Sequence, residues 1–191
     1  HETGESSPDP ELVERIQRFF NSITFENRMK WAYFERYHDE YPQENVLQHA
    51  VSEIQSLRAF DNAQPFRVRG HATLWQSSYA VPADVRTSHD TTLIQERIHA
   101  HIADYHKYFA GHVRTFVLFN EPFHETRLID RLYTPEMTDE RIDEYVRWFQ
   151  IAQTTDPEAR LFINEYNVLN DWTSDNEQVH QYKALIDALR D

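Results

Sequence analysis

Apolar residues along the chain alternate between two kinds of spacing, and this alternation restricts the possible folds more than any other sequence feature. Segment 93–109 carries apolar residues on one helical face, whereas residues 115–119 form a nearly continuous apolar run of strand length. The same alternation predicts helices at 12–20, 47–57, 93–109, 142–149 and 179–189, and strands at 22–25, 66–70, 115–119 and 161–163. The order is therefore one leading helix followed by four strand–helix units.

Such units predict an α/β fold with a parallel sheet, because the helical connections are long enough for right-handed crossovers. The helix at 142–149 is expected to bury Ile142, Val146 and Phe149, which lie at helical spacing. Periodicity alone fits both a doubly wound sheet and a barrel. An eight-unit barrel needs about 250 residues, so a chain of 191 residues is expected to hold only about half of its strands.

Charge and composition exclude several classes of function. Lys and Arg number 19 and Asp and Glu 32, which leaves a net charge of −13 and no basic patch for nucleic acid or an anionic membrane. No apolar run approaches the roughly 18 residues of a spanning helix. The chain has no Cys, so disulfides, thiolate metal sites and Cys nucleophiles are absent. Residues 1–10 lack an apolar signal core and are expected to be a disordered tail or a cloning remnant, followed by one domain at 11–191.

The sequence predicts no metal and no nucleotide cofactor. The chain has 11 histidines, but His99 and His101 are two residues apart on a predicted helix and so point to different faces. His106 and His112 fall near the end of that helix, and no HExxH pattern occurs. We interpret these histidines as surface or packing residues. Neither a Gly-x-Gly-x-x-Gly nor a Walker pattern is present, which argues against a bound nucleotide.

Polar clusters follow each of the four predicted strands. They are Glu26-Asn27, His71 with Trp75, Asn120-Glu121-Pro122 and Asn164-Glu165-Tyr166-Asn167. The carboxyl ends of parallel strands face the active-site side of an α/β fold, so these clusters are expected to converge on one rim. Carboxylates for acid/base or nucleophilic work, amides and imidazole for hydroxyl groups, and Trp for pyranose faces together suit a sugar.

Four segments carry a resemblance to a known family: 20–31 (FNSITFENRMKW), 69–75 (RGHATLW), 120–122 (NEP) and 161–167 (LFINEYN). In this order they resemble glycoside hydrolase family 10, the endo-β-1,4-xylanase family, over about residues 12 to 190. The resemblance implies a (β/α)8 TIM barrel that cleaves xylan with retention of configuration, and a secreted enzyme. The predicted fold is thus a partial (β/α)8 barrel of about four parallel strand–helix units plus a leading helix.

The resemblance also implies the site residues. Glu121 matches the general acid/base, and Asn120 before it is suited to the sugar 2-hydroxyl. The other residues predicted to bind substrate are Glu26, Asn27, Lys30, His71, Trp75, Tyr166 and Asn167. Each also has a structural interpretation: a strand-end carboxylate can cap a helix or form an ion pair, and Trp31 is assigned to the core. For Tyr166 and Asn167 the two interpretations are equally supported.

The sequence departs from the family at several positions. Phe116-Val117 stands where a Trp-Asp pair is usual, Gln76 where His is frequent, and Glu165 where Asp is usual. The family's nucleophile is a Glu at the end of the seventh strand, which is expected beyond Asp191, and the first strand is expected before residue 11. A retaining glycosidase needs two carboxyl groups about 5 to 5.5 Å apart. Glu165 as a substitute is disfavoured, because it follows the strand next to that of Glu121.

We therefore expect these 191 residues alone to have no normal xylanase activity. Open strand edges are expected to promote self-association or pairing with the missing barrel segment. Two alternatives remain open: a non-catalytic xylan-binding module that kept the sugar-binding residues, and another barrel glycosidase acting on β-glucans.

Overall fold

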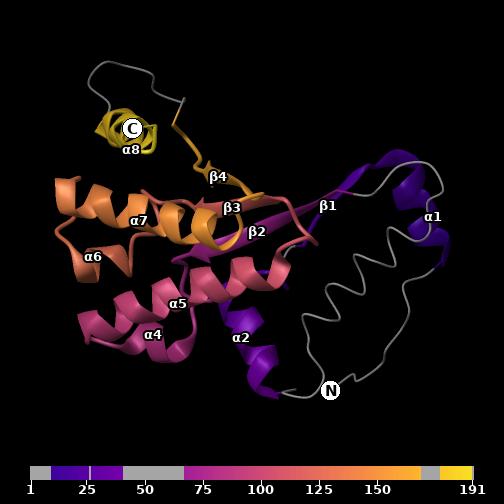
Figure 1. Ribbon diagram of the computed structural model, residues 1–191, viewed down its shortest axis with the longest axis horizontal. Helices are drawn as coiled ribbons and strands as arrows, with labels where there is room; N and C mark the ends of the chain where they lie inside the picture. The colour runs from indigo at the N-terminus through magenta and orange to yellow at the C-terminus, as the bar shows by residue number, and fades with distance from the viewer. Residues whose placement is uncertain (1–9, 26, 41–66, 169–176, 191) are drawn as a thin grey trace.

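The computed structural model describes residues 10–25, 27–40, 67–168 and 177–190. Its centre is a parallel sheet whose strands follow one another in chain order, as Figure 1 shows. The strands are β1 (Ser22–Thr24), β2 (Arg67–Trp75), β3 (Thr115–Asn120) and β4 (Arg160–Asn164). A doubly wound sheet reverses its strand order at a switch point, whereas the order here runs β1-β2-β3-β4 without reversal. The prediction of four parallel units of a (β/α)8 barrel is thus confirmed.

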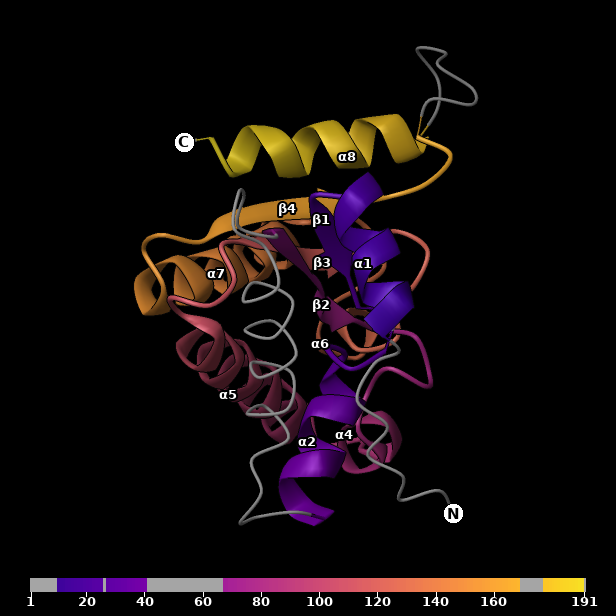
Figure 2. The same cartoon turned by 90° about the vertical axis from the view of Figure 1, so that its right-hand side faces the viewer.

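Helices precede β1 and follow the strands. They are α1 (Pro10–Phe19), α2 (Trp31–Glu40), α4 (Ala83–Thr87), α5 (Thr91–Phe109), α6 (Ile129–Leu132), α7 (Asp139–Thr155) and α8 (Glu177–Ala188). Figure 1 shows α1 beside β1 and far from α8, and Figures 1 and 2 both show α8 beside β4. None of the helices in the described residues is long and apolar enough to cross a membrane.

The two long helices begin where side chains cap their first turns. The Asp90 carboxylate accepts hydrogen bonds from the backbone N–H groups of Thr92 and Leu93 at the start of α5. At the start of α7, the Thr138 hydroxyl accepts from the Arg141 N–H, and acidic residues occupy the first turn. These caps satisfy donors that a helix N-terminus leaves unpaired, and the acidic residues complement the helix dipole.

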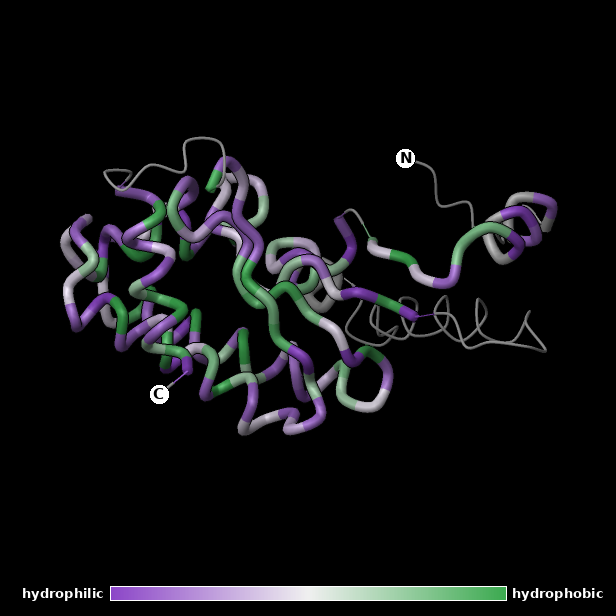
Figure 3. The backbone as a smooth tube through the Cα atoms, turned by 90° about the horizontal axis from the view of Figure 1, so that it is seen from above, coloured by the Kyte–Doolittle hydropathy of each residue, from purple (hydrophilic) through white to green (hydrophobic). Residues whose placement is uncertain are grey.

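The core lies between the sheet and helices α5 and α7. Phe119 of β3 packs edge-on against Tyr145 and Trp148 of α7, with ring centroids 5.2 and 5.0 Å apart. Phe116 of the same strand packs against Tyr105 of α5 at 5.9 Å. Each of these rings is at most 2% exposed, and burial of such a side chain stabilises a protein by about 1.5–3 kcal/mol. Figure 3 shows hydrophobic residues concentrated along the strands at the centre.

Gly70 allows β2 to lie close to the aromatic core. A Cβ atom at this position would stand 2.5 Å from Cδ1 of Phe116, which is too close for two carbon atoms. Because Gly70 has no side chain, the Phe116 ring can fill the space beside β2 at this position.

Strand β2 is longer than predicted. The expected strand was 66–70, but pairing with β3 continues through Leu74 opposite Phe119 and Trp75 opposite Asn120. His71 and Trp75 consequently lie within the strand rather than after it, and Trp75 is its last residue. The apolar pattern did not predict residues 71–75 as strand, because they do not form an apolar run. Pairing with β3 holds them in the strand instead.

Two helix predictions also need correction or completion. The core stripe of α7 is formed by Tyr145, Trp148 and Ala152, whereas Ile142, Val146 and Phe149 are only half-buried. The two large aromatic rings determine which side of the helix faces the sheet. Helix α2 was not predicted, and the predicted helix at 47–57 lies outside the described residues, as do residues 1–9 of the predicted tail.

Two histidines of α5 are packing residues. His101 stacks on Trp31 with ring centroids 4.5 Å apart, and its Nε2–H donates to the Thr73 carbonyl oxygen at 2.8 Å. His106 is fully buried with Nε2 3.2 Å from the Thr73 hydroxyl. Burial lowers the pKa of His101 to about 3 and that of His106 to about 4. Among the described residues, no group of three His, Cys, Asp or Glu side chains could hold a metal ion.

The buried histidines predict a loss of stability in mild acid. Both folded pKa values lie below the ordinary value of 6.5, so the unfolded chain binds more protons and stability falls as the pH drops below about 6.5. Replacing His106 by Gln removes one titrating group. The dependence of the unfolding free energy on pH should then be flatter by up to about 1.4 kcal/mol per pH unit.

Urea unfolding at several pH values between about 5 and 7 measures this slope. The exposed His89→Gln change serves as the matched control and should retain the wild-type slope, because that side chain is exposed. An unchanged slope in His106→Gln would show that this ring does not titrate on unfolding.

Candidate active site

Glu121 stands at the carboxyl end of β3 and is held from the neighbouring strand. The indole Nε1–H of Trp75 donates to Glu121 Oε2 at 3.1 Å. The backbone N–H of Glu121 donates to the Asn164 carbonyl oxygen at 2.7 Å, and its φ of 56° turns the chain in the left-handed region. This conformation is costly for a residue with a side chain, and residues held in such conformations cluster at functional sites. The backbone thus aims the Glu121 side chain toward the end of β2.

Asn120 is the last residue of β3 and is 4% exposed. Its Oδ1 accepts a hydrogen bond from Nδ2 of Asn164 at 2.7 Å, so the amide oxygen points toward β4. The register pairs Asn120 with Trp75 on one side and with Asn164 on the other. The carboxyl ends of β2, β3 and β4 therefore lie side by side at one edge of the sheet.

A buried lysine and two aromatic rings form a second part of the site. Lys30 is 4% exposed, and its Nζ donates to Asn27 Oδ1 at 2.8 Å and to the Tyr79 hydroxyl at 3.0 Å. The same ammonium lies 4.8 Å from the Trp75 ring centroid and 4.7 Å from that of Tyr79. Burial among hydrogen bonds and ring faces distinguishes Lys30 from a solvated surface charge.

His71 lies near this cluster, with its ring centroid 6.3 Å from that of Trp75. Burial, followed by the positive charges of Lys30 and Arg69, lowers the pKa of His71 below its ordinary value. The imidazole is therefore held in the neutral form, in which one nitrogen donates and the other accepts.

On the other side of Glu121, Tyr166 follows the end of β4. Its ring stacks on His124 with centroids 3.8 Å apart and an interplanar angle of 23°, yet the residue remains 47% exposed. Partial burial, followed by the nearby Glu121 carboxylate, raises the pKa of the Tyr166 hydroxyl. Asn167 is exposed and has a φ of 61°.

The structure thus brings most of the predicted residues to one rim. Asn27, Lys30, His71 and Trp75 gather beside Glu121 and Asn120, and Tyr166 with Asn167 follows β4, while Glu26 lies outside the described residues. Sequence reasoning missed Tyr79, although an aromatic residue four positions after Trp75 was a usable signal. The Glu165 side chain is fully buried and accepts three N–H hydrogen bonds, which does not suit a second reactive carboxylate.

Gln76 has a structural task directly behind the rim. Its side chain is 4% exposed, and its Oε1 accepts hydrogen bonds from the backbone N–H groups of Leu128 at 2.7 Å and Ile129 at 2.9 Å. The amide therefore caps the start of α6 and ties it to the end of β2. These contacts give Gln76 a structural role at a position where the resembled family frequently has His.

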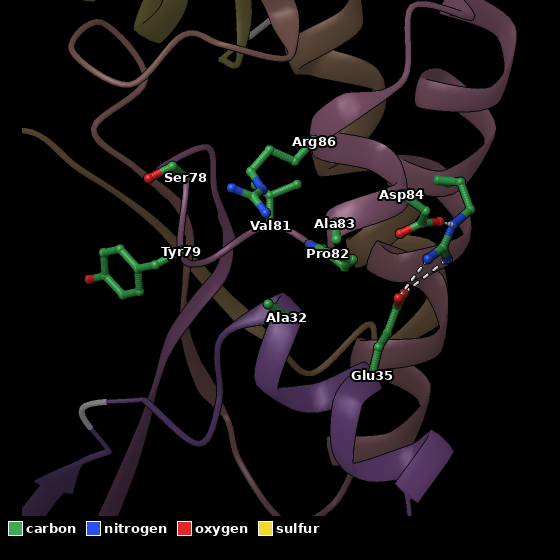
Figure 4. Close-up of a pocket in the computed structure, with 10 residues that line it drawn as sticks. Ala32, Glu35, Ser78, Tyr79, Val81, Pro82, Ala83, Asp84 and Arg86 are labelled. Carbon is green, nitrogen blue, oxygen red and sulfur yellow. Dashed lines mark hydrogen bonds and ion pairs between the residues drawn. The ribbon is translucent and has the colours of Figure 1, made fainter.

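A pocket of about 690 Å³ lies next to the rim, between α2, α4 and the segment after β2. Glu35 of α2 receives two hydrogen bonds from the Arg97 guanidinium there, and Arg97 Nε also contacts Asp84. Figure 4 shows Tyr79 pointing away from this ion pair. Tyr79 therefore stands between the pocket and the Lys30 cluster, and the polar groups of the pocket are largely engaged with one another.

Comparison with known proteins gives a consistent result. The profile of Glycosyl hydrolase family 10 matches residues 2–190. Endo-1,4-beta-xylanase 3 of Hypocrea jecorina is 27% identical over 153 residues, which cover 80% of this chain and 41% of that protein. The GH10 structure from Paenibacillus barcinonensis has a TM-score of 0.71 at 24% identity, covering 94% of this chain and 53% of that one.

A mutant of xylanase A from P. fluorescens subsp. cellulosa, solved in complex with xylopentaose, has a TM-score of 0.72 at 21% identity. It matches 96% of this chain and 51% of its own length. The chain therefore spans 41 to 53% of the lengths of these three proteins.

The contacts of Gln76 predict a specific loss of stability. Replacement by Leu leaves two buried N–H groups at the start of α6 without an acceptor, at a cost of about 1–3 kcal/mol each. The unfolding free energy, measured in urea, should fall by about 2–4 kcal/mol. The Gln76→Glu variant keeps an acceptor for both N–H groups, so its unfolding free energy should fall clearly less. Equal losses in the two variants would contradict a capping role.

Proposed function

The chain belongs to glycosyl hydrolase family 10, and we propose that it forms the acid/base side of a retaining endo-β-1,4-xylanase. The observation that carries the proposal is the Glu121 carboxylate, held by Trp75 at a rim where sugar-binding residue types gather. In this chemistry one carboxylic acid protonates the leaving oxygen while a carboxylate about 5 to 5.5 Å away attacks the anomeric carbon. We assign the second carboxylate to a barrel strand outside the described residues.

Glu121 has two tasks in the proposed mechanism. It first gives its proton to the oxygen of the bond being cleaved, and the ionised carboxylate then removes a proton from the water that releases the sugar from the enzyme. The Trp75 N–H holds the carboxylate in place for both steps. Asn120, one residue earlier, is assigned to the sugar 2-hydroxyl, where a hydrogen bond strengthens in the transition state.

The Lys30 cluster is assigned to the sugar units before the cleaved bond. Asn27, Lys30 and the neutral His71 offer donors and acceptors for hydroxyl groups, and the Trp75 ring offers an apolar face. Glu26 is proposed for the same set from its place in the sequence, and Tyr166 and Asn167 for the side after β4.

Xylan or a xylo-oligosaccharide is the proposed substrate. Two of the compared proteins support this: one is named an endo-1,4-beta-xylanase, and the other was solved with xylopentaose. The enzyme is proposed to be secreted and to need no cofactor. Two features support pairing with further barrel strands or self-association: β4 has a single partner strand among the described residues, and its Phe162 is 42% exposed.

The proposal predicts that Glu121→Gln abolishes xylan hydrolysis by the full-length protein. Reducing-sugar release should fall by about 10²–10⁴-fold, because the variant cannot protonate the leaving oxygen. Glu125→Gln, on the same segment, is the matched control and should retain wild-type rates. Binding of xylopentaose by calorimetry should persist in Glu121→Gln, because only the reactive proton is lost.

An activated substrate separates the two tasks of Glu121. Release of dinitrophenolate from 2,4-dinitrophenyl β-xylobioside needs no protonation, so the first turnover should stay fast in Glu121→Gln, and azide should restore steady-state release. A wild-type protein that binds oligosaccharide without turnover would instead identify a binding module. Hydrolysis of carboxymethylcellulose but not of xylan would identify a β-glucan-cleaving enzyme.

A further inference from the structure

We infer that His124 and Glu165 are positioning residues that hold the Tyr166 ring as a wall of the sugar groove on the leaving-group side of Glu121. The inference rests on the proposed function and adds two residues to it. Neither His124 nor Glu165 is needed for proton transfer. Their contacts instead connect the segment after β3 with the segment after β4.

The Glu165 carboxylate is the centre of this connection. Its side chain is fully buried, and its Oε2 accepts the backbone N–H of Phe123 at 2.9 Å. Its Oε1 accepts from His124 Nδ1 at 2.7 Å and from the Tyr166 backbone N–H at 2.8 Å. A buried carboxylate is costly unless its oxygens are hydrogen-bonded. The three donors meet that requirement, and they come from both segments.

Tyr166 is therefore held twice by the same carboxylate. Its backbone N–H bonds to Glu165 directly, and its ring stacks on the imidazole that Glu165 orients. A half-exposed tyrosine at a strand end would otherwise exchange rotamers in water. With the imidazole 3.8 Å behind it, the ring keeps one orientation, which a flat sugar-binding surface requires. Such preorganisation improves binding because less entropy is lost when the ligand docks.

The position of Tyr166 indicates which sugar unit it contacts. Trp75 ends β2, Glu121 follows β3, and Tyr166 follows β4, so the carboxylate lies between two aromatic side chains along the rim. The Trp75 side, with Lys30, is assigned to units before the cleaved bond. The Tyr166 side therefore faces the unit that departs with the proton from Glu121.

The side-chain length of Glu165 suits this connection, because its oxygens contact donors of both segments. An Asp at this position would be one methylene shorter, so its oxygens would lie farther from the Phe123 N–H and from His124 Nδ1, which Glu165 contacts at 2.9 and 2.7 Å. Glu165 and His124 thus form a side-chain contact between the two segments. The two residues are predicted to act as a pair.

Two substrates with different leaving groups test the inference in the full-length enzyme. Xylohexaose places sugar units against Tyr166, whereas β-xylobiosyl fluoride loses only a fluoride ion, which cannot touch that ring. His124→Ala should lower kcat/KM for xylohexaose on the order of tenfold, mainly through a higher KM, because a displaced platform misplaces the substrate. Its kcat/KM for the fluoride should stay within about twofold of wild type.

Rescue and control variants exclude a general structural defect. His124→Phe keeps a ring behind Tyr166 and should recover most of the xylohexaose activity, while Glu165→Ala should resemble His124→Ala. Arg127→Ala, an exposed position on the same segment, should match wild type on both substrates. Equal losses of His124→Ala on the two substrates, or no recovery in His124→Phe, would overturn the inference.

A measurement without substrate tests the geometry separately. In a ¹H–¹³C spectrum, the His124 Cε1–Hε1 signal should carry the ring-current shift of Tyr166, move in Tyr166→Leu and also move in Glu165→Ala. A signal that stays in place in both variants would refute the stacked arrangement. A wild-type enzyme that cleaves neither xylohexaose nor the fluoride would refute the proposed function itself, whatever the spectrum shows.

Discussion

The parallel register of β2, β3 and β4 is the constraint on which the site depends. It sets Trp75 opposite Asn120 and Asn120 opposite Asn164, so three strands end at one level. The register is held by β3, whose residues from 116 to 120 are all buried. A shift by one residue would exchange the two faces of this strand, moving Phe119 out of the aromatic core. The site geometry and the core packing are therefore two consequences of one alignment.

The class of fold could be predicted from the sequence because strand and helix periods differ. Residues 91–109 and 115–120 form the helix and strand that their apolar spacing indicates. The choice between barrel and doubly wound sheet could not come from periodicity, because strand order is set by tertiary contacts. Tertiary contacts also set the length of β2, because its last residues are held by pairing with β3. They likewise set the core face of α7, because two large aromatic rings decide which side packs against the sheet.

The candidate site could be predicted in outline but not in its supporting contacts. Polar residues at strand ends pointed to Glu121 and Trp75, and these two side chains are hydrogen-bonded. The sequence did not predict the contacts of Tyr79, Gln76 and His124. Each of these residues contacts a partner more than 40 positions away in the sequence. A local pattern can mark a single residue, as the spacing from Trp75 could have marked Tyr79, but it carries no information on the distant partner. The departures at positions 76 and 165 were nonetheless visible, and both now have a physical account.

Two glutamates at neighbouring strand ends show how surroundings separate the roles of one residue type. Glu121 accepts its side-chain hydrogen bond from the Trp75 indole and remains half-buried at the rim, where a ligand can reach it. The Glu165 side chain is fully buried, and its oxygens are occupied by three N–H donors. A reactive carboxyl group must exchange a proton with substrate or water, and a carboxylate whose oxygens are already occupied inside the protein is poorly placed to do so. Accessibility therefore supports the proposed chemistry at Glu121 and the proposed positioning role of Glu165, even though both follow strands of the same sheet.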